Sequence, residues 1–418
     1  MTKQEQILNG LSCALQNTNS QIRVSLLAEI ANYLPQSLQT EVRSLQAECL
    51  RKALVPIKAM RHEGDRLNAL EHLVHKLLPD VEVPPETLAI TKALPSGISR
   101  VKALTVLAPH LAPDLLLEAL DIARAFRKPN GEYCLALSLT AIAPQLPEPL
   151  REEATLEALA AADSLPSEIF RDDVYRSNAL IAVADILPEA LRADVLQKAL
   201  ESASAIEEEW CRAMNFARLA PKLPETLQAK VFQEALDAAK NEAEDWATSS
   251  ALMVLAPELP PDLLSEAANL AKGLRSNRYL SNLNRLKVLI ATTAKLPEML
   301  SEVFATVKKV RSEDERTEAL VAIAPHLPPE LLPAAFDVAK DMRAKRNRLP
   351  ALIALASPIS KLPEEELFPL WQTIEHLLSQ LSQREFAHHV MALAAVIHRI
   401  GGEEAVAEAL VKIQNAKQ

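Results

Sequence analysis

The stretch Glu318-Ala-Leu-Val-Ala-Ile-Ala-Pro-His-Leu-Pro-Pro-Glu-Leu-Leu-Pro-Ala-Ala-Phe-Asp-Val-Ala-Lys340 decides the fold of this chain of 418 residues. Apolar residues recur with helical spacing on both sides of Leu327-Pro328, which predicts a helix, a tight turn and a second helix. Proline disfavours helix in the residue before it, and its fixed φ suits the first turn of the helix after it. A Leu-Pro pair in this setting therefore ends one helix and begins the next.

Variants of this stretch recur along nearly the whole chain. The leucine of each pair, called here the turn leucine, falls at Leu34, Leu78, Leu146, Leu187, Leu223, Leu259, Leu296, Leu327 and Leu362, and Leu111-Ala112-Pro113 is a degenerate copy. From Leu78 onward, the shortest step between neighbouring turn leucines is thirty-one positions and the longest is forty-one. A period in this range indicates stacked supersecondary units. We therefore predict an all-α solenoid of antiparallel helix-pair repeats, similar to HEAT repeats.

The composition agrees with this prediction. Hydrophobic residues make up 49% of the chain and aromatic residues only 4%, so the core consists mainly of alanine and leucine, which both favour helix. The step from Leu34 to Leu78 is longer than any later one and lies outside the period. Because terminal repeats need a polar outer face, we interpret residues 1–62 as an atypical N-terminal helical cap, 63–362 as the repeat array and 363–418 as a C-terminal helical cap.

Several absences predict the compartment. No run of about 18 uncharged apolar residues is present, so no transmembrane helix and no membrane partner are expected. The N-terminus lacks the basic start and apolar core of a signal peptide. The four cysteines are far apart and form no Cys-x-x-Cys pair, which is typical of reduced thiols. These features predict a cytoplasmic protein.

Two segments carry a family resemblance. Leu107-Ala-Pro-His-Leu-Ala-Pro-Asp-Leu-Leu116 and Ile323-Ala-Pro-His-Leu-Pro-Pro-Glu-Leu-Leu332 resemble the degenerate helical repeats at the C-terminal ends of some bacterial STAND-type signalling NTPases, as does the closing segment Leu393–Gly402. The resemblance covers about residues 63–418. It implies a bacterial array that senses or binds a partner. It does not imply NTPase activity, because the chain has no Gly-x-x-x-x-Gly-Lys-Ser/Thr phosphate loop.

One repeat position is often aromatic. Tyr133, Trp210 and Trp246 each lie thirteen positions before their turn leucines, and Tyr175 lies twelve before its own. We favour the interpretation that each ring packs on the preceding repeat. The alternative is an aromatic stripe that contacts a ligand, since large aromatic side chains anchor interfaces.

A second repeat position is often arginine. Eleven positions before the turn leucine stand Arg100, Arg176, Arg212, Arg285 and Arg316. Acids recur in the second helices at Asp121, Glu201, Asp237 and Asp337. Because the guanidinium group suits carboxylates, we predict an Arg–carboxylate ladder between repeats. The alternative is an arginine-lined groove for an acidic ligand.

The distribution of charge gives a further candidate site. The net charge is −10, yet residues 270–348 contain 15 Lys and Arg against 9 Asp and Glu. We call the cations of three successive inter-repeat loops the basic edge: Lys272, Arg275, Arg278, Lys308, Lys309, Arg311, Arg343, Lys345, Arg346 and Arg348. They are either solvated cations near helix C-termini or a surface for an acidic protein or a nucleic acid. The acidic balance of the whole chain argues against nucleic acid as the default partner.

No pattern typical of catalysis is present. Glu71-His72-Leu-Val-His75 is not the His-Glu-x-x-His order of zinc proteases, and we expect neither a metal nor a cofactor. The sequence therefore predicts a non-catalytic scaffold that binds a protein partner. Two alternatives stay open: nucleic-acid binding through the basic edge, and a glycosylase-like or lyase-like enzyme whose pocket would combine Trp210 and Trp246 with Glu207–Glu209 and Asp245.

Overall fold

The computed structural model describes residues 23, 24, 27, 28, 31, 33, 34 and 36–415, apart from 79, 128–130, 167–171, 276–280, 364, 368, 369 and 373–392. Over these residues the secondary structure is helical and contains no strand. The predicted all-α solenoid of helix pairs is confirmed. None of the described helices is long and apolar enough to cross a membrane.

The chain divides into two compact units. Unit 1 comprises Met1–Ile57, His72–Val81 and Pro297–Gln418, and unit 2 comprises Lys58–Glu71 and Glu82–Leu296. Helix α4 (Glu63–Val74) contributes to both. This division follows contacts within the structure and does not test the predicted boundaries of the two caps, which stay a prediction.

Unit 2 contains most of the helix pairs. In each pair we call the helix before the turn leucine the first helix and the one after it the second helix. The first helices are α6 (Gly97–Leu107), α8 (Glu132–Ile142), α10 (Asp172–Ala184), α12 (Glu209–Leu219), α14 (Asp245–Leu255) and α16 (Asn282–Thr293). The second helices are α5 (Glu86–Lys92), α7 (Pro113–Arg124), α9 (Leu150–Asp163), α11 (Glu189–Ser204), α13 (Glu225–Asn241) and α15 (Pro261–Gly273).

Unit 1 contains the same motif in its C-terminal part. Its described helices are α3 (Gln39–Ala59), α17 (Pro297–Lys308), α18 (Glu313–Ile323), α19 (Leu332–Lys340), α20 (Lys345–Ile359) and α23 (Ala394–Asn415). Helix α23 is interrupted at Gly401 and at Gly402, whose φ is +67°, a conformation that glycine adopts without strain. Residues 373–392 of the predicted C-terminal cap lie outside the described residues.

The turn leucines form the centre of each repeat. From Leu78 to Leu362 each of them is at most 8% exposed. At Leu223 the backbone is extended (φ −81°, ψ 158°), as expected for a residue that precedes proline. Four repeats place a short 3-10 turn before this leucine, formed by Ala-Pro-x: η2 (Ala108–His110), η3 (Ala143–Gln145), η4 (Ala220–Lys222) and η5 (Ala324–His326).

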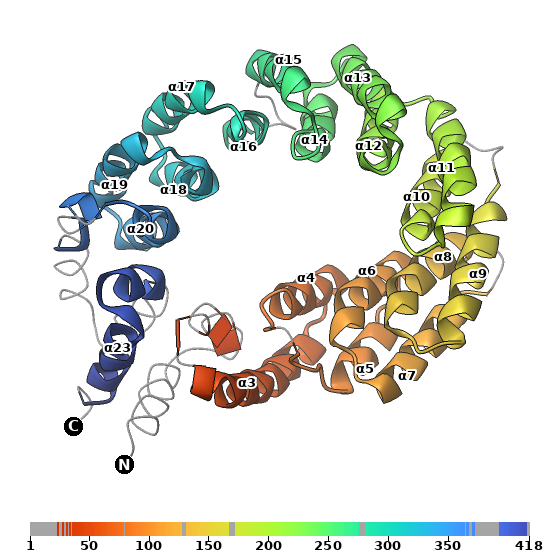
Figure 1. Cartoon of the computed structure of the whole chain (residues 1–418), viewed down its shortest axis with the longest axis horizontal. Coiled ribbons are helices and arrows are strands. Elements are labelled where there is room, and N and C mark those ends of the chain that lie inside the picture. Colours follow the sequence, from red (N-terminus) through yellow and green to blue (C-terminus); the bar gives the residue numbers. More distant parts are fainter. Residues whose placement is uncertain are drawn as a thin grey trace. The chain divides into compact units, whose positions relative to one another are not determined.

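The helices of unit 2 form two layers (Figure 1). Each first helix from α6 to α16 packs against the first helix of the next repeat, and α13 likewise packs against α15 in the layer of second helices. Alanine allows this close approach: Ala136, Ala213, Ala247 and Ala251 on the first helices are all nearly or fully buried. The two layers thus present separate surfaces, one from the first helices and one from the second helices.

The predicted Arg–carboxylate ladder is wrong in its partners. Instead of the acids on the second helices, four of the five arginines bind backbone carbonyls at the end of the preceding repeat: Arg100 Nε donates to Leu94 O at 2.7 Å, Arg212 Nη1 to Ile206 O at 2.7 Å, Arg285 Nη1 to Leu274 O at 3.2 Å and Arg316 Nη1 to Val310 O at 3.1 Å. A helix end leaves carbonyls without intrahelical donors, and the guanidinium group supplies several N–H groups in one plane. These arginines therefore cap the preceding repeat.

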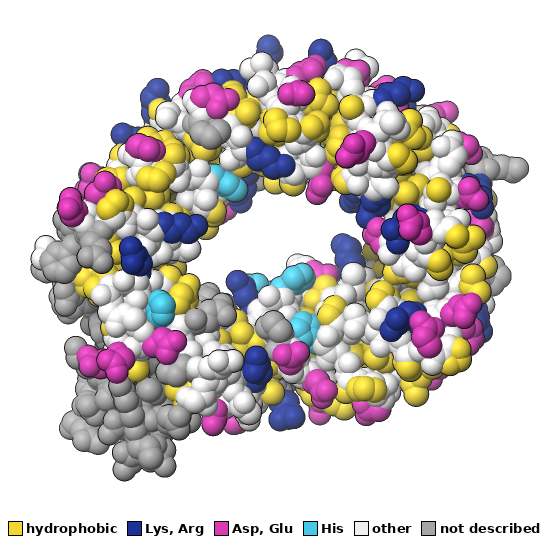
Figure 2. All heavy atoms as spheres, in the orientation of Figure 1, with side chains coloured by type: hydrophobic (Ala, Val, Ile, Leu, Met, Phe, Trp, Pro, Cys, Tyr) yellow, Lys and Arg dark blue, Asp and Glu magenta, His cyan; other side chains and the backbone are white. Residues whose placement is uncertain are grey.

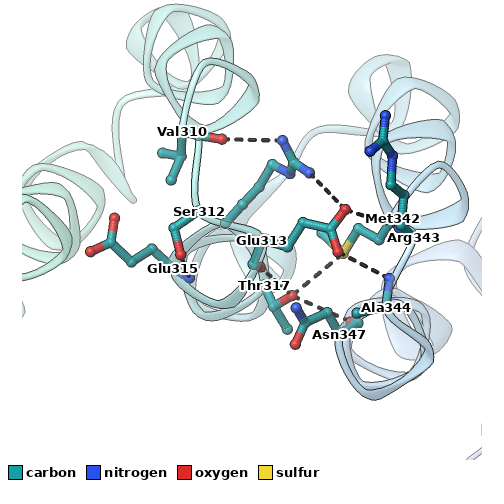
Figure 3. A network of polar contacts seen from close by, with 10 residues as sticks. Val310, Ser312, Glu313, Glu315, Thr317, Met342, Arg343, Ala344 and Asn347 are labelled. Atoms are coloured by element: carbon teal, nitrogen blue, oxygen red, sulfur yellow. Dashed lines mark hydrogen bonds and ion pairs between the residues drawn. The ribbon is translucent and has the colours of Figure 1, made fainter.

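An acidic repeat position, absent from the sequence predictions, completes the link between repeats (Figure 3). Glu313 opens α18, fourteen positions before its turn leucine, and its carboxylate accepts the backbone N–H groups of Arg343 and Ala344, each at 3.0 Å. These two hydrogen bonds lower the pKa of Glu313. Asp245, at the same repeat position, accepts the backbone N–H of Arg275 at 3.3 Å. The acid of one first helix thus holds the loop that opens the next repeat.

Carboxylate ladders do occur, but in the layer of second helices. Arg124 on α7 forms ion pairs with Glu153 (2.6 Å) and Glu157 (3.1 Å) on α9. Further pairs join neighbouring second helices: Lys92–Glu118, Lys198–Asp163 and Lys240–Glu266. This layer therefore neutralises many of its own charges.

Candidate functional site

The four aromatic residues predicted at one repeat position meet in two pairs. The rings of Tyr133 on α8 and Tyr175 on α10 have centroids 4.6 Å apart at 45°, and those of Trp210 on α12 and Trp246 on α14 lie 5.7 Å apart at 57°. Each ring therefore packs against a ring of the neighbouring repeat. Tyr175 remains 37% exposed and the other three rings are partly exposed, so the pairs also form part of the surface.

A large hollow crosses the layer of first helices. It has a volume of about 480 Å³ and is lined by residues of four successive first helices and their turns. Its apolar lining comes from Tyr133, Leu137, Ile181, Ala182, Ala217, Pro221 and Val254. We call it the first hollow. Its volume lies within the range of about 300–1,000 Å³ that is usual for ligand sites.

The polar groups of the first hollow bind one another across repeats. Arg218 Nη1 donates to Asn178 Oδ1 at 2.8 Å, and Lys222 Nζ forms an ion pair with Asp185 at 2.5 Å. Glu258 completes the charged lining, so two cations face two carboxylates. Burial raises the pKa of the Tyr133 phenol, although the positive charge of Arg218 acts against this. The hydroxyl is therefore protonated at neutral pH and can donate a hydrogen bond.

A second hollow lies beside the first, between α14 and α16. It has a volume of about 310 Å³ and is lined by Trp246, Ser249, Ser250, Met253, Asn284, Lys287 and Val288. Met253 is 44% exposed. Because Met253 lines the second hollow and Val254 the first, the two hollows adjoin along α14. We call the surface from α8 to α16 that carries both hollows the binding face.

Sequence reasoning found only the aromatic part of this face. Asn178, Asp185, Arg218 and Lys222 stand nine, two, five and one positions before their turn leucines, and none of these residue types repeats at its position in the neighbouring repeats. A search for recurring residues cannot find them. They could have been found by listing the exposed positions of the first helices and by knowing which first helices pack against one another.

The residues of the basic edge are divided between the two units. Lys272 and Arg275 belong to unit 2, whereas the residues from Lys308 onward belong to unit 1. Arg278 and the side chains of Lys345 and Arg346 lie outside the described residues. Both Lys272 and Arg275 are exposed at the end of α15, and the backbone N–H of Arg275 is bound by Asp245.

In unit 1 the cations of the basic edge adjoin carboxylates. Lys308, Lys309 and Arg311 are exposed, and they immediately precede the acidic first turn of α18 at Glu313–Glu315. The ammonium group of Lys308 lies 5.8 Å from the ring centroid of Phe304. Arg343 is exposed in the next loop, which Glu313 holds, and Arg348 is half-buried on α20. Figure 2 likewise shows basic and acidic side chains interspersed over the visible face, with hydrophobic side chains between them.

The site required by the enzyme alternative is not assembled beside the tryptophans. No carboxylate lines the hollow next to Trp246, and neither Glu207–Glu209 nor Asp245 belongs to its described lining. Over the described part of the chain, no group of three or more His, Cys, Asp or Glu side chains is arranged to hold a metal ion.

Comparison with known proteins leaves the family open. No family model matches the chain, and no curated protein matches it. Among solved structures, the karyopherin Kap121p bound to the SUMO protease Ulp1p is 11% identical, with a TM-score of 0.37 over 96% of this chain and 49% of that one. Kap121p alone is 12% identical, with a TM-score of 0.35 over 98% and 51%. This chain therefore spans about half the length of those karyopherins.

A further similar structure is a circular tandem repeat protein with a novel repeat topology. It is 12% identical, with a TM-score of 0.17 over 98% of this chain and 95% of that one. At these values the likenesses identify no relative and transfer no activity, so the function has to be argued from the residues of this chain.

Proposed function

We propose that this protein is a non-catalytic scaffold that binds a protein partner on the binding face of unit 2. The observation that carries the proposal is the pair of adjoining hollows, about 480 and 310 Å³, that crosses five successive first helices. Much of the lining is apolar, and a few polar groups converge on each hollow. Such lining is typical of sites that bind another molecule.

The residue types of the binding face favour a protein over a nucleic acid. Trp, Tyr, Met and Arg are enriched in protein interfaces, and Trp246, Met253 and Arg218 lie here with part of their surfaces exposed. The charged lining of the first hollow is balanced, since Arg218 and Lys222 face Asp185 and Glu258. A phosphate backbone needs a positive surface, so it would gain little from this hollow.

A narrower proposal concerns the biological setting. The resemblance of residues 63–418 to the repeat arrays of STAND-type NTPases supports a role as a sensor or adaptor in bacterial signalling or defence, in the cytoplasm. This narrower proposal rests on the sequence resemblance alone. A related chain would have to supply the NTPase, because the phosphate loop is absent from this one.

The test uses the full chain and two matched variants. Met253→Glu places a charge in the second hollow, whereas Leu156→Glu places the same charge on α9 in the other layer, where the leucine is 50% exposed. A partner captured from lysate after nuclease treatment and then purified should bind Met253→Glu at least about tenfold more weakly, or about 1.4 kcal/mol. It should bind Leu156→Glu as it binds the parent chain. Equal binding by both variants would place the interface elsewhere.

The same assay decides about the basic edge. The nucleic-acid alternative replaces this proposal if three results are obtained together. Recovery of the partner from lysate would require nucleic acid, the double variant Lys308→Glu/Lys309→Glu would recover none, and Met253→Glu would bind normally. Binding through the basic edge should also weaken steeply as salt is added.

A further inference from the structure

We infer that the first hollow binds the C-terminus of the protein partner, with the terminal carboxylate on Arg218, Asn178 and Tyr133 and a bulky apolar last side chain against the lining beside them. This inference rests on the proposed function and specifies which part of the partner enters the binding face. Three features of the first hollow carry it: hydrogen-bond donors without an acceptor, a cation without a carboxylate, and apolar side chains close to the donors.

The hydrogen-bond donors come from α8, α10 and α12, three successive first helices that pack against one another. Arg218 Nη1 donates to Asn178 Oδ1 at 2.8 Å, the one hydrogen bond that either side chain makes within the described part of the chain. It uses the amide oxygen of Asn178, so the N–H₂ group and most N–H groups of the guanidinium are left to donate. Burial raises the pKa of the Tyr133 phenol, so its hydroxyl carries a proton, and it too has no acceptor among the described residues. These donors require an acceptor from outside the chain.

The ion pairs of the lining indicate the charge of that acceptor. Lys222 is neutralised by Asp185, with which it forms an ion pair at 2.5 Å. Arg218 has no carboxylate within ion-pair distance over the described ranges, although Glu258 also lines the hollow. A carboxylate fits the guanidinium, because its two oxygens can take two parallel N–H groups and further donors besides. Since the lining already holds two acids, a carboxylate with one negative charge is favoured over a phosphate with two.

The apolar lining favours a C-terminal carboxylate over that of an internal acid. Leu137 lies one helical turn after Tyr133 on α8. Ile181 likewise lies three positions after Asn178 on α10, so apolar side chains adjoin the donors. A C-terminal residue joins its carboxylate and its side chain through one carbon atom, and one residue can therefore contact both. The carboxylate of an internal Asp or Glu ends its own side chain, and other residues would have to contact the apolar lining.

The test is selection against the full chain from a library of random octapeptides displayed with free C-termini. We expect the selected peptides to end in a bulky apolar residue such as leucine, isoleucine or phenylalanine. In affinity measurements on the synthetic peptides, conversion of the terminal carboxylate to an amide should weaken binding at least about tenfold, because it removes the charge that Arg218 binds. Replacement of the last residue by alanine should weaken binding as well.

Two variants and a control connect the peptides to this hollow. Arg218→Met removes the cation and should weaken binding at least about tenfold. Lys230→Met removes an exposed cation of α13, in the layer of second helices, and should leave binding unchanged. Asn178→Asp places a carboxylate beside the guanidinium, where it takes the position of the external one, and should also weaken binding at least about tenfold. Circular dichroism checks that the three variants fold.

Other outcomes overturn the inference. Peptides that bind equally well as amides, or that depend on an internal acid, would show that the hollow does not take a C-terminus. Selected peptides that bind Arg218→Met and Asn178→Asp as they bind the parent chain would place their site elsewhere. Failure to select any peptide would contradict the inference as well. The proposed function would still stand in each case if a purified partner binds in a manner sensitive to Met253→Glu.

Discussion

The two helix layers of unit 2 treat their exposed polar groups differently. Neighbouring second helices are joined by ion pairs such as Arg124–Glu157 and Lys198–Asp163, and apolar side chains such as Leu117 and Leu156 stand exposed among them. The first helices also form an ion pair between repeats, Lys222–Asp185, but they border two hollows, where the exposed Met253 and partly exposed aromatic rings lie beside amide and hydroxyl groups that can still bond. One layer therefore has the character of a solvated surface, and the other that of a surface prepared for a partner.

This difference follows from where the repeats are held together. The arginine eleven positions before a turn leucine caps the preceding repeat, as Arg212 does. The acid fourteen positions before a turn leucine can hold the following loop, as Asp245 does. Both interactions use the N-terminal ends of the first helices, close to the inter-repeat loops. These two contacts leave the exposed side of the middle and C-terminal parts of the first helices, and of the turns after them, uncovered, and it is there that Asn178, Arg218 and Lys222 line the first hollow.

The largest effect is expected where the two layers meet. Leu259 is 1% exposed at the turn between α14 and α15, so Leu259→Ala removes core contacts from both layers. The loss should be about 2–5 kcal/mol in the free energy of unfolding. Leu156→Ala, at a half-exposed leucine of the second layer, should change it by less than about 0.5 kcal/mol.

Denaturant unfolding of both variants measures this contrast. Comparable losses would mean that the turn leucines are not the centre of the repeats. Unfolding of a repeat array need not be two-state, so the midpoint at one probe, for example the fluorescence of Trp210 and Trp246, is the quantity to compare.

A smaller change in the free energy of unfolding is expected when polar contacts are removed, and it should differ between the two layers. Arg212→Leu leaves the carbonyl of Ile206 without its guanidinium donor and also removes the ion pair with Glu209. An orphaned partly buried acceptor costs about 1–3 kcal/mol. Arg124→Leu removes the half-buried ion pair with Glu157 and the more exposed pair with Glu153. Exposed ion pairs are worth about 0–1 kcal/mol and are screened by salt, so we expect a loss of about 1 kcal/mol that added salt reduces.

The two arginine variants are compared by thermal unfolding at low and high salt. The loss in Arg212→Leu should exceed that in Arg124→Leu and should persist at high salt, whereas the smaller loss should fade. The opposite order would show that ion pairs between second helices, and not the capped carbonyls, hold neighbouring repeats together.

The periodic features of the fold could be predicted from the sequence, because each repeat restates them. The turn leucines predicted the helix pairs, and α12 and α13 indeed lie on the two sides of Leu223. The partner of the arginine position was mispredicted for a physical reason. Spacing shows that Arg and acid recur, but a guanidinium group binds a carbonyl as readily as a carboxylate, and only the path of the loop decides between them.

The candidate site was predictable only in part. Tyr133, Tyr175, Trp210 and Trp246 occupy a repeated position and were singled out, but a repeated position does not reveal that they meet in pairs. The residues that line the first hollow extend along the chain from Tyr133 to Glu258, and its polar residues Asn178, Asp185, Arg218 and Lys222 do not recur at their positions in the neighbouring repeats. Their convergence depends on helix packing across four repeats, which the one-dimensional pattern does not contain.

The smallest effect concerns the acid that holds the next loop. The pKa of Glu313 is lowered mainly by the backbone N–H groups of Arg343 and Ala344. A carboxyl whose pKa is lower in the folded than in the unfolded chain contributes stability above its unfolded pKa, about 4.3, and loses it as the pH falls through the folded value. Stability should therefore fall below about pH 4.3.

Glu313→Gln should remove this part of the acid dependence, because the amide oxygen accepts a hydrogen bond at every pH and carries no charge. The measurement is the unfolding midpoint between pH 7 and pH 3, for the parent chain and the variant. Because the Glu313 side chain is still 24% exposed, water partly screens its charge, and the difference between the two curves should be small and should appear only below about pH 4.3. Glu330→Gln, at an exposed glutamate for which no ion pair is described, is the control. Parallel curves for all three proteins would mean that the charge of Glu313 does not help to hold Arg343 and Ala344. The acidic repeat position would then reflect only the preference for acids at helix N-termini, and it would have no part in joining repeats.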